Sequence, residues 1–102
     1  MGDVTAKQHM VNRDQATVTG LQALSHIAAD PDLFGMFLDQ AGTNAADVRA
    51  QATDPAFLGF VLDFLMQDDA RVIGFAGAIG IAPEDIARVR QALPGGDVPE
   101  WT

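Results

Sequence analysis

Ser25 and His26 are adjacent in the sequence and carry the two side-chain types of a nucleophile and its general base. Ser25 is the only serine of the chain, and there is no cysteine that would provide another nucleophile. Adjacent residues of a helix point about 100° apart, so the hydroxyl and the imidazole do not face each other. We therefore predict that this pair is not catalytic and that the chain has no catalytic residue.

Carboxylates are the other candidates for chemistry. Asp39 and Asp63 occupy matching places in two similar ten-residue segments, and Asp68 is followed directly by Asp69. Paired carboxylates can act as acid and base or hold a metal ion. The twelve-residue calcium loop is absent, however, and histidine does not recur at zinc spacing. We predict no metal site, no cofactor and no enzymatic activity; an enzyme built on these aspartates is the hypothesis with the least support.

One spacing is typical of a helix-turn-helix unit. Ala76 is followed by Gly80 four residues later, and Ile86 comes six residues after the glycine. In such a unit the second helix, here Pro83 to Leu93, lies in the major groove of DNA. The same spacing also describes any tight corner between two helices, so it leaves both interpretations open.

Arg88 and Arg90 are the residues of this helix that would contact DNA. Glu84 and Asp85, in contrast, place two negative charges at the end of the helix that would face the groove. The whole chain has 14 Asp and Glu against six Lys and Arg, which gives a net charge of −8. Because DNA-binding proteins normally carry a basic surface, we expect no nucleic-acid partner and keep DNA binding as the alternative function.

Two similar ten-residue segments indicate how the chain is organised. DPDLFGMFLD begins at Asp30, and DPAFLGFVLD begins 24 residues later at Asp54. An aspartate can accept hydrogen bonds from the free amides of a first helical turn, and proline suits the first helical position. The repeat therefore predicts two helices that start in the same way, from Pro31 to about Ala41 and from Pro55 to Gln67.

The second of these helices is apolar on most of its sides. Between Pro55 and Gln67 only a thin polar stripe remains, formed by Gly59, Asp63 and Gln67. A helix of this kind packs against neighbours all round. We predict that it is the central helix of a monomer, with an interface between two copies as the alternative.

Further helices follow from the pattern on either side. Leu38, Gly42 and Val48 repeat the spacing described above for residues 76, 80 and 86, which predicts two helix pairs that each turn at a glycine. A lead helix from about Gln15 to Ala29 precedes them. Its apolar residues recur at helical spacing: Val18, Leu21, Leu24, Ile27 and Ala28.

The predicted fold class is all-α, a compact bundle of about six short helices with two helix-turn-helix-like pairs around a central apolar helix. No segment alternates apolar and polar residues as a half-buried strand would. We expect residues 1–13 to form a disordered tail, 14–94 a single helical domain and 95–102, which include Trp101, a flexible C-terminal tail.

The bulk composition limits where such a protein works. A chain of 102 residues with 48% hydrophobic residues can form one stable core, and the absence of cysteine favours a reducing compartment. The N-terminus lacks the apolar stretch of a secretory signal. The longest apolar stretch has about ten residues, whereas a membrane span needs about 20. We expect a cytoplasmic protein without a membrane partner.

The chain resembles a small alphaproteobacterial family that is catalogued only as a domain of unknown function. The resemblance covers about Leu21 to Gly96 and is carried by the Asp-Pro helix starts, the central VLDFLMQDD and the closing ALPGG. It implies an all-α fold and a short bacterial cytoplasmic protein. It implies no activity, cofactor or catalytic residue.

Taken together, these features predict a small non-enzymatic helical module that acts through protein–protein contact. Its partner is another protein or a second copy, the latter through the helix between Phe57 and Met66. Large apolar side chains on the repeated helices would build a groove for a partner helix. The candidate groove residues are Phe34, Met36, Phe37, Phe60, Phe64 and Met66.

Overall fold

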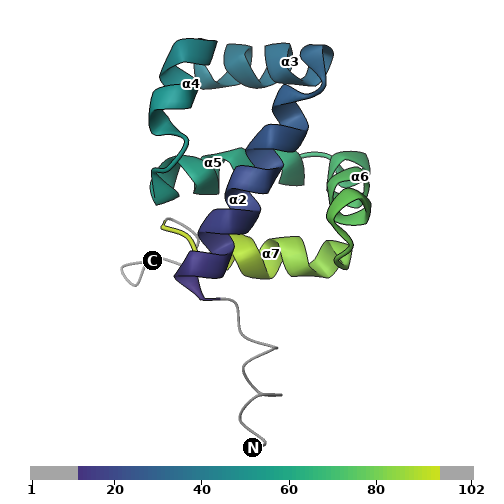
Figure 1. Cartoon of the computed structure of the whole chain (residues 1–102). Coiled ribbons are helices and arrows are strands. Elements are labelled where there is room, and N and C mark those ends of the chain that lie inside the picture. Colours follow the sequence, from purple (N-terminus) through teal and green to yellow (C-terminus); the bar gives the residue numbers. More distant parts are fainter. Residues whose placement is uncertain (1–11, 95–102) are drawn as a thin grey trace, which may run out of the picture.

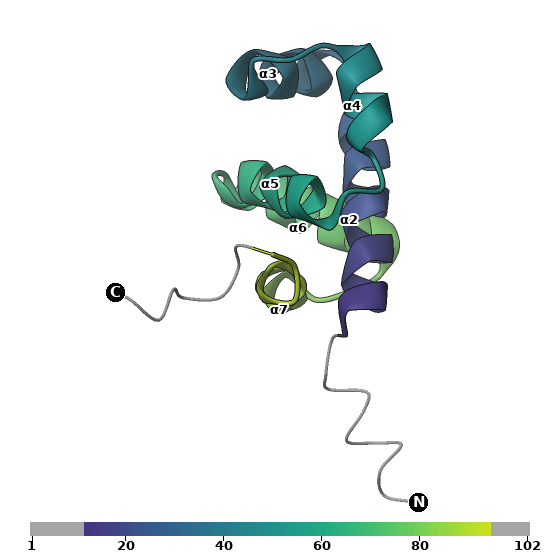
Figure 2. The same cartoon turned by 90° about the vertical axis from the view of Figure 1, so that its left-hand side faces the viewer.

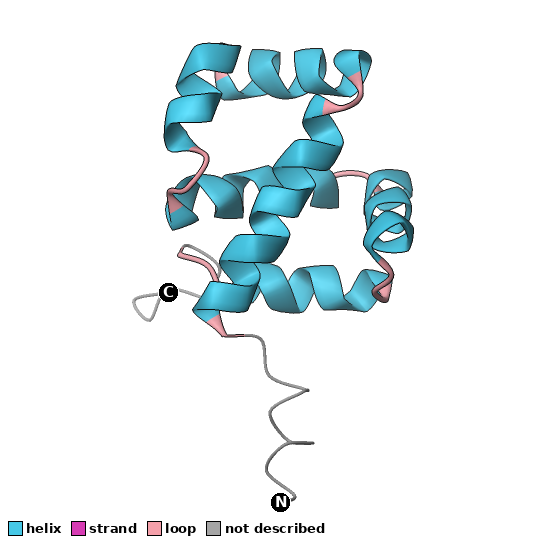
Figure 3. Cartoon of the chain, in the orientation of Figure 1, coloured by secondary structure: helices cyan, strands magenta, loops and turns pink. Residues whose placement is uncertain are grey.

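A computed structural model describes residues 12–94, and most of these residues lie in six α-helices (Figure 3). No strand occurs within this range, so the predicted all-α class is confirmed. In chain order the helices are α2 (Arg13–Ala28), α3 (Pro31–Ala41), α4 (Ala45–Gln51), α5 (Pro55–Met66), α6 (Asp69–Ile79) and α7 (Pro83–Gln91).

The repeated Asp-Pro segments start α3 and α5 as predicted. The carboxylate of Asp30 accepts hydrogen bonds from the amides of Asp32 and Leu33 at 3.1 and 3.2 Å. Asp54 accepts one from the amide of Ala56 at 3.0 Å. Each of these caps satisfies backbone donors that have no partner inside the helix.

The two helix-turn-helix-like pairs are α3–α4 and α6–α7, and each turns at a glycine. Gly42 and Gly80 have φ values of 68° and 77°, in the left-handed region that only glycine adopts without strain. Six residues after each glycine an apolar side chain is buried, Val48 in the first pair and Ile86 in the second. The shared spacing therefore reflects how the two corners pack.

Figures 1 and 2 show α3, α5 and α7 stacked in this order, with α2 running across one side of the stack. In Figure 1, α4 and α6 lie on opposite sides of α2. Seven of the twelve residues of α5 are buried. This confirms α5 as the central helix, while the alternative of a dimer formed through α5 stays a prediction.

A cluster of phenylalanines joins α3 to α5. The ring of Phe37 lies 5.2 Å from that of Phe64, 5.7 Å from Phe60 and 6.0 Å from Phe57, measured between centroids. The contacts with Phe57 and Phe64 are edge-on, an arrangement that aromatic pairs prefer. Phe37 and Phe64 are both buried.

The buried face of α2 differs from the predicted one. It contains small residues, Ala16, Gly20 and Ala23, besides Leu24 and Ile27. A Cβ atom added to Gly20 would lie 2.9 Å from Cβ of Leu58, so the glycine permits a close approach of α2 to α5. The consequence is that two large residues of the predicted apolar pattern point outward. The exposed fractions of Val18 and Leu21 are 58% and 41%.

The beginning of α2 also differs slightly from the prediction. Asn12 caps the helix by accepting a hydrogen bond from the amide of Gln15 at 2.8 Å, so that Arg13 belongs to the helix and not to a tail. The remaining predictions for the two tails, including that for Trp101, lie outside the described residues.

Candidate functional site

Two of the six residues predicted to line a groove are inaccessible in the structure. Phe37 and Phe64 belong to the core and cannot reach a partner, while Phe34 and Phe60 are half-buried. Met36 and Met66 are exposed. Phe37 and Phe64 are therefore not groove residues, because α3 and α5 bury these two rings against each other. The other four residues stay a prediction.

An apolar surface lies instead along α2. Val18, Leu21 and Ser25 follow one another at helical spacing on its exposed side. A hollow of about 490 Å³ lies beside them, between α2 and α6, and its far wall is formed by Ile79. Gln22 and His26 complete its lining.

A second hollow of about 330 Å³ lies beside α2 near α3 and α4. Phe34, Val48 and Arg49 contribute to its lining. Leu21 and Ser25 border both hollows and so form a ridge between them. We call Val18, Leu21 and Ser25 with the two flanking hollows the α2 surface.

Charged residues stand near both ends of the α2 surface. Asp14 is exposed and precedes Val18 by four positions, on the same side of the helix. Arg49 is exposed and borders the second hollow, beside the C-terminal half of α2. Within residues 12–94 neither charge has an ion-pair partner. The surface is therefore apolar in its middle, with the carboxylate of Asp14 near one end and the guanidinium of Arg49 near the other.

Ser25 and His26 both line the hollow beside α6. The ring of His26 lies 5.4 Å from that of Phe75, between centroids, and no hydrogen bond joins it to Ser25 among the described residues. In this arrangement the two side chains provide polar atoms at the edge of an apolar hollow, where a bound segment would find hydrogen-bonding groups.

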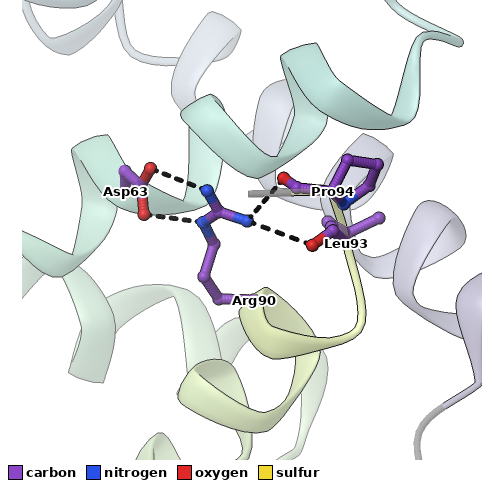
Figure 4. Close-up of polar contacts among 4 residues, drawn as sticks. All are labelled: Asp63, Arg90, Leu93 and Pro94. Atoms are coloured by element: carbon purple, nitrogen blue, oxygen red, sulfur yellow. Dashed lines mark hydrogen bonds and ion pairs between the residues drawn. The ribbon is translucent and has the colours of Figure 1, made fainter. Parts of the chain in front are cut away.

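A different polar cluster fastens α7 to α5 (Figure 4). Nε and Nη2 of Arg90 donate to the two carboxylate oxygens of Asp63 at 2.7 and 3.0 Å. Nη1 donates to the carbonyl oxygens of Leu93 and Pro94 at 3.5 and 3.0 Å. The guanidinium lies against Gly59, where an added Cβ would be 2.7 Å from Nη1.

This cluster corrects the role predicted for Arg90. Its side chain is only 12% exposed and all three of its nitrogens donate within the chain, so Arg90 does not present a free guanidinium to DNA. Arg88 is 61% exposed and forms an ion pair of 2.7 Å with Asp85. Sequence reasoning missed the contact with Asp63 because nothing in a single sequence indicates which of the five described arginines lies beside this aspartate.

Two of the aspartates considered for metal binding have partners within the chain. Asp68 caps α6 through the amide of Ala70 at 2.9 Å, and Asp63 binds Arg90. Between residues 12 and 94 there is no group of three potential metal ligands of the His, Cys, Asp or Glu type. In the same part of the chain no helix has both the length and the apolar character needed to cross a membrane.

A family model described as "Protein of unknown function (DUF3572)" matches residues 13–96. The chain belongs to this family. The match begins where α2 begins and extends two residues beyond the described part, so it covers the whole helical bundle of this DUF3572 protein. It confirms the resemblance found in the sequence and assigns no activity. No curated protein and no solved structure shows significant similarity to the chain.

Proposed function

We propose that this DUF3572 protein is a non-enzymatic helical module of the cytoplasm that acts through protein–protein contact, and that the α2 surface is its contact site. The observation that carries the proposal is the exposure of Val18 and Leu21 beside two hollows with largely apolar walls. Large apolar side chains next to concave apolar surface gain free energy when a partner covers them.

The other large apolar residues that are exposed in the described part of the chain lie outside the two hollows. Ile73 is 59% exposed, and Met36 and Met66 are 49% and 39% exposed, but none of them lines either hollow. Apolar residues exposed singly are common on folded proteins. Ile73 is therefore a suitable control: it is as exposed as Val18 but lies on α6, outside the α2 surface.

The polar side chains of the α2 surface are typical of a protein–protein interface rather than of a catalytic site. Protein interfaces combine an apolar centre with a polar rim. Here Val18 and Leu21 form the centre, and Gln22, Ser25 and His26 provide hydrogen-bonding groups beside them. Asp14 and Arg49 add charges near the two ends, and such charges set the orientation of a partner more than its affinity.

A photo-crosslinking amino acid placed at position 21 tests this proposal in cells that express the full chain. We expect a discrete covalent adduct from position 21 and none from position 73. Val18→Asp introduced into the same chain should lower the adduct yield about tenfold or more, because it places a charge in the centre of the contact. Equal labelling from positions 21 and 73, or none from position 21, would refute the proposal.

A further inference from the structure

We infer that the α2 surface binds a second copy of this chain, with the two α2 helices antiparallel. The inference rests on the proposed function and names its partner. Three features of the α2 surface carry it: the order of its charges, the position of its two protruding apolar residues, and the presence of protrusions and hollows on the same patch.

The charges near the two ends of the α2 surface have opposite sign. Asp14 stands at the N-terminal end of α2, and Arg49 stands beside the part of α2 between Leu21 and Ala28. In an antiparallel pair, Asp14 of each copy comes close to Arg49 of the other. In a parallel pair, like charges would meet at both ends, which is unfavourable. The charge order therefore selects the antiparallel arrangement.

The positions along α2 agree with a two-fold axis. Asp14 and Ser25 are separated by 11 residues, or about 16 Å along the helix. An axis that brings Asp14 of one copy opposite Ser25 of the other passes between Val18 and Leu21. It places Val18 of each copy against Leu21 of the second copy. The two exposed large apolar residues of α2 thus lie at the centre of the contact.

The α2 surface carries both protruding apolar side chains and the hollows that could receive the same side chains of a second copy. Leu21 stands on the ridge between hollows of about 490 and 330 Å³. A symmetric dimer uses the same patch on both subunits, so the exposed apolar side chains of one copy would meet the hollows of the other. A partner with a purely apolar flat face would leave the hollows unfilled.

The net charge of −8 on each chain opposes self-association. At physiological ionic strength, however, charges are screened beyond about 8 Å. Repulsion between the distant acidic helix starts is then weak, whereas Asp14 and Arg49 act across the contact itself. We accordingly expect the dimer to form at physiological ionic strength and not in buffer of low ionic strength.

Sedimentation equilibrium of the full chain at physiological ionic strength tests the inference. We expect a reversible dimer, with a dissociation constant that Leu21→Asp raises about tenfold or more and Ile73→Asp changes less than about twofold. A mass that stays at 10.8 kDa up to about 1 mM, where even weak specific contacts form, would overturn it.

Charge reversal tests the antiparallel register. Asp14→Arg and Arg49→Asp should each weaken the dimer about threefold to tenfold, because symmetry repeats every contact twice. Both substitutions in one chain should restore the dissociation constant to within about twofold of the original. A double variant as weak as either single variant would exclude this register. Both positions are exposed, so circular dichroism should show folded variants.

The crosslinking experiment separates this inference from the proposed function. An adduct from position 21 with about twice the mass of the 10.8 kDa chain supports both. An adduct of another mass, together with a monomeric mass in sedimentation equilibrium, would overturn the inference that the partner is a second copy. The proposed function would still hold, because position 21 would still contact a protein. If position 21 gives no adduct, the proposed function fails as well.

Discussion

Arg90 and Asp63 lie 27 positions apart in the chain and form a two-pronged ion pair, with donor–acceptor distances of 2.7 and 3.0 Å. The remaining nitrogen of Arg90 binds the carbonyl oxygens of Leu93 and Pro94. One side chain thus links the central helix α5, the last helix α7 and the segment that follows it. Planar, bidentate recognition of this kind is specific to arginine among the basic residues.

Asp63→Asn should lower the free energy of unfolding by about 1–2 kcal/mol, because Arg90 keeps a largely buried charge but loses its anionic partner. Urea denaturation followed by circular dichroism measures this change. Asp39→Asn is the matched control, since Asp39 occupies the equivalent place in the first repeated segment and has no ion-pair partner among the described residues. It should change the stability by less than about 0.5 kcal/mol.

Gly59→Ala should fail to stabilise α5, although alanine is the better helix former by about 1 kcal/mol. The new Cβ would lie 2.7 Å from Nη1 of Arg90 and 3.1 Å from the carbonyl oxygen of Pro94. Gly74→Ala on α6 is the control: no atom lies within 4 Å of its added Cβ, so it should gain about 0.5–1 kcal/mol.

The cause of the difference can be checked in the Arg90→Ala background. Once the guanidinium is absent, Gly59→Ala should become more favourable than it is in the unmodified chain, as a double-mutant cycle of unfolding free energies would show. Equal effects of Gly59→Ala in both backgrounds would mean that Arg90 does not limit this position.

Phe37→Ala should lower the free energy of unfolding by about 3–5 kcal/mol, because it removes the ring that contacts Phe57, Phe60 and Phe64. Met36→Ala changes the adjacent residue, whose side chain is 49% exposed, and should cost less than about 1 kcal/mol. Thermal or urea unfolding of both variants measures the contrast. A comparable loss for both would contradict the assignment of Phe37 to the core and Met36 to the surface.

Most of the fold could be predicted because the residues that start or end a helix lie close together in the sequence. The caps at Asp30 and Asp54, and the left-handed turns at Gly42 and Gly80, depend on residues within a few positions of one another. The central place of α5 followed from its nearly continuous apolar surface, since such a helix must be covered on most sides.

The candidate site could not be predicted in the same way. Helical spacing groups Val18 with Leu24 and Ile27, but it does not show which part of a wide apolar face meets α5. The structure places α2 so that Gly20 lies against Leu58, and this close contact turns Val18 outward. Gly20 was the signal in the sequence for this contact. Glycine inside a helix lowers the stability of that helix, so its presence there indicates that packing requires a residue without a side chain.

Because the chain contains no cysteine, the outward position of Leu21 can be measured directly by the reaction of Leu21→Cys with a soluble thiol reagent. In dilute protein we predict fast modification at position 21. Leu24→Cys, whose position is 6% exposed, should react at least about 100-fold more slowly, because a buried thiol reacts only when the structure opens. As the protein concentration rises, position 21 should become protected. Protection of position 21 already in dilute protein would place Leu21 in the core and contradict the account.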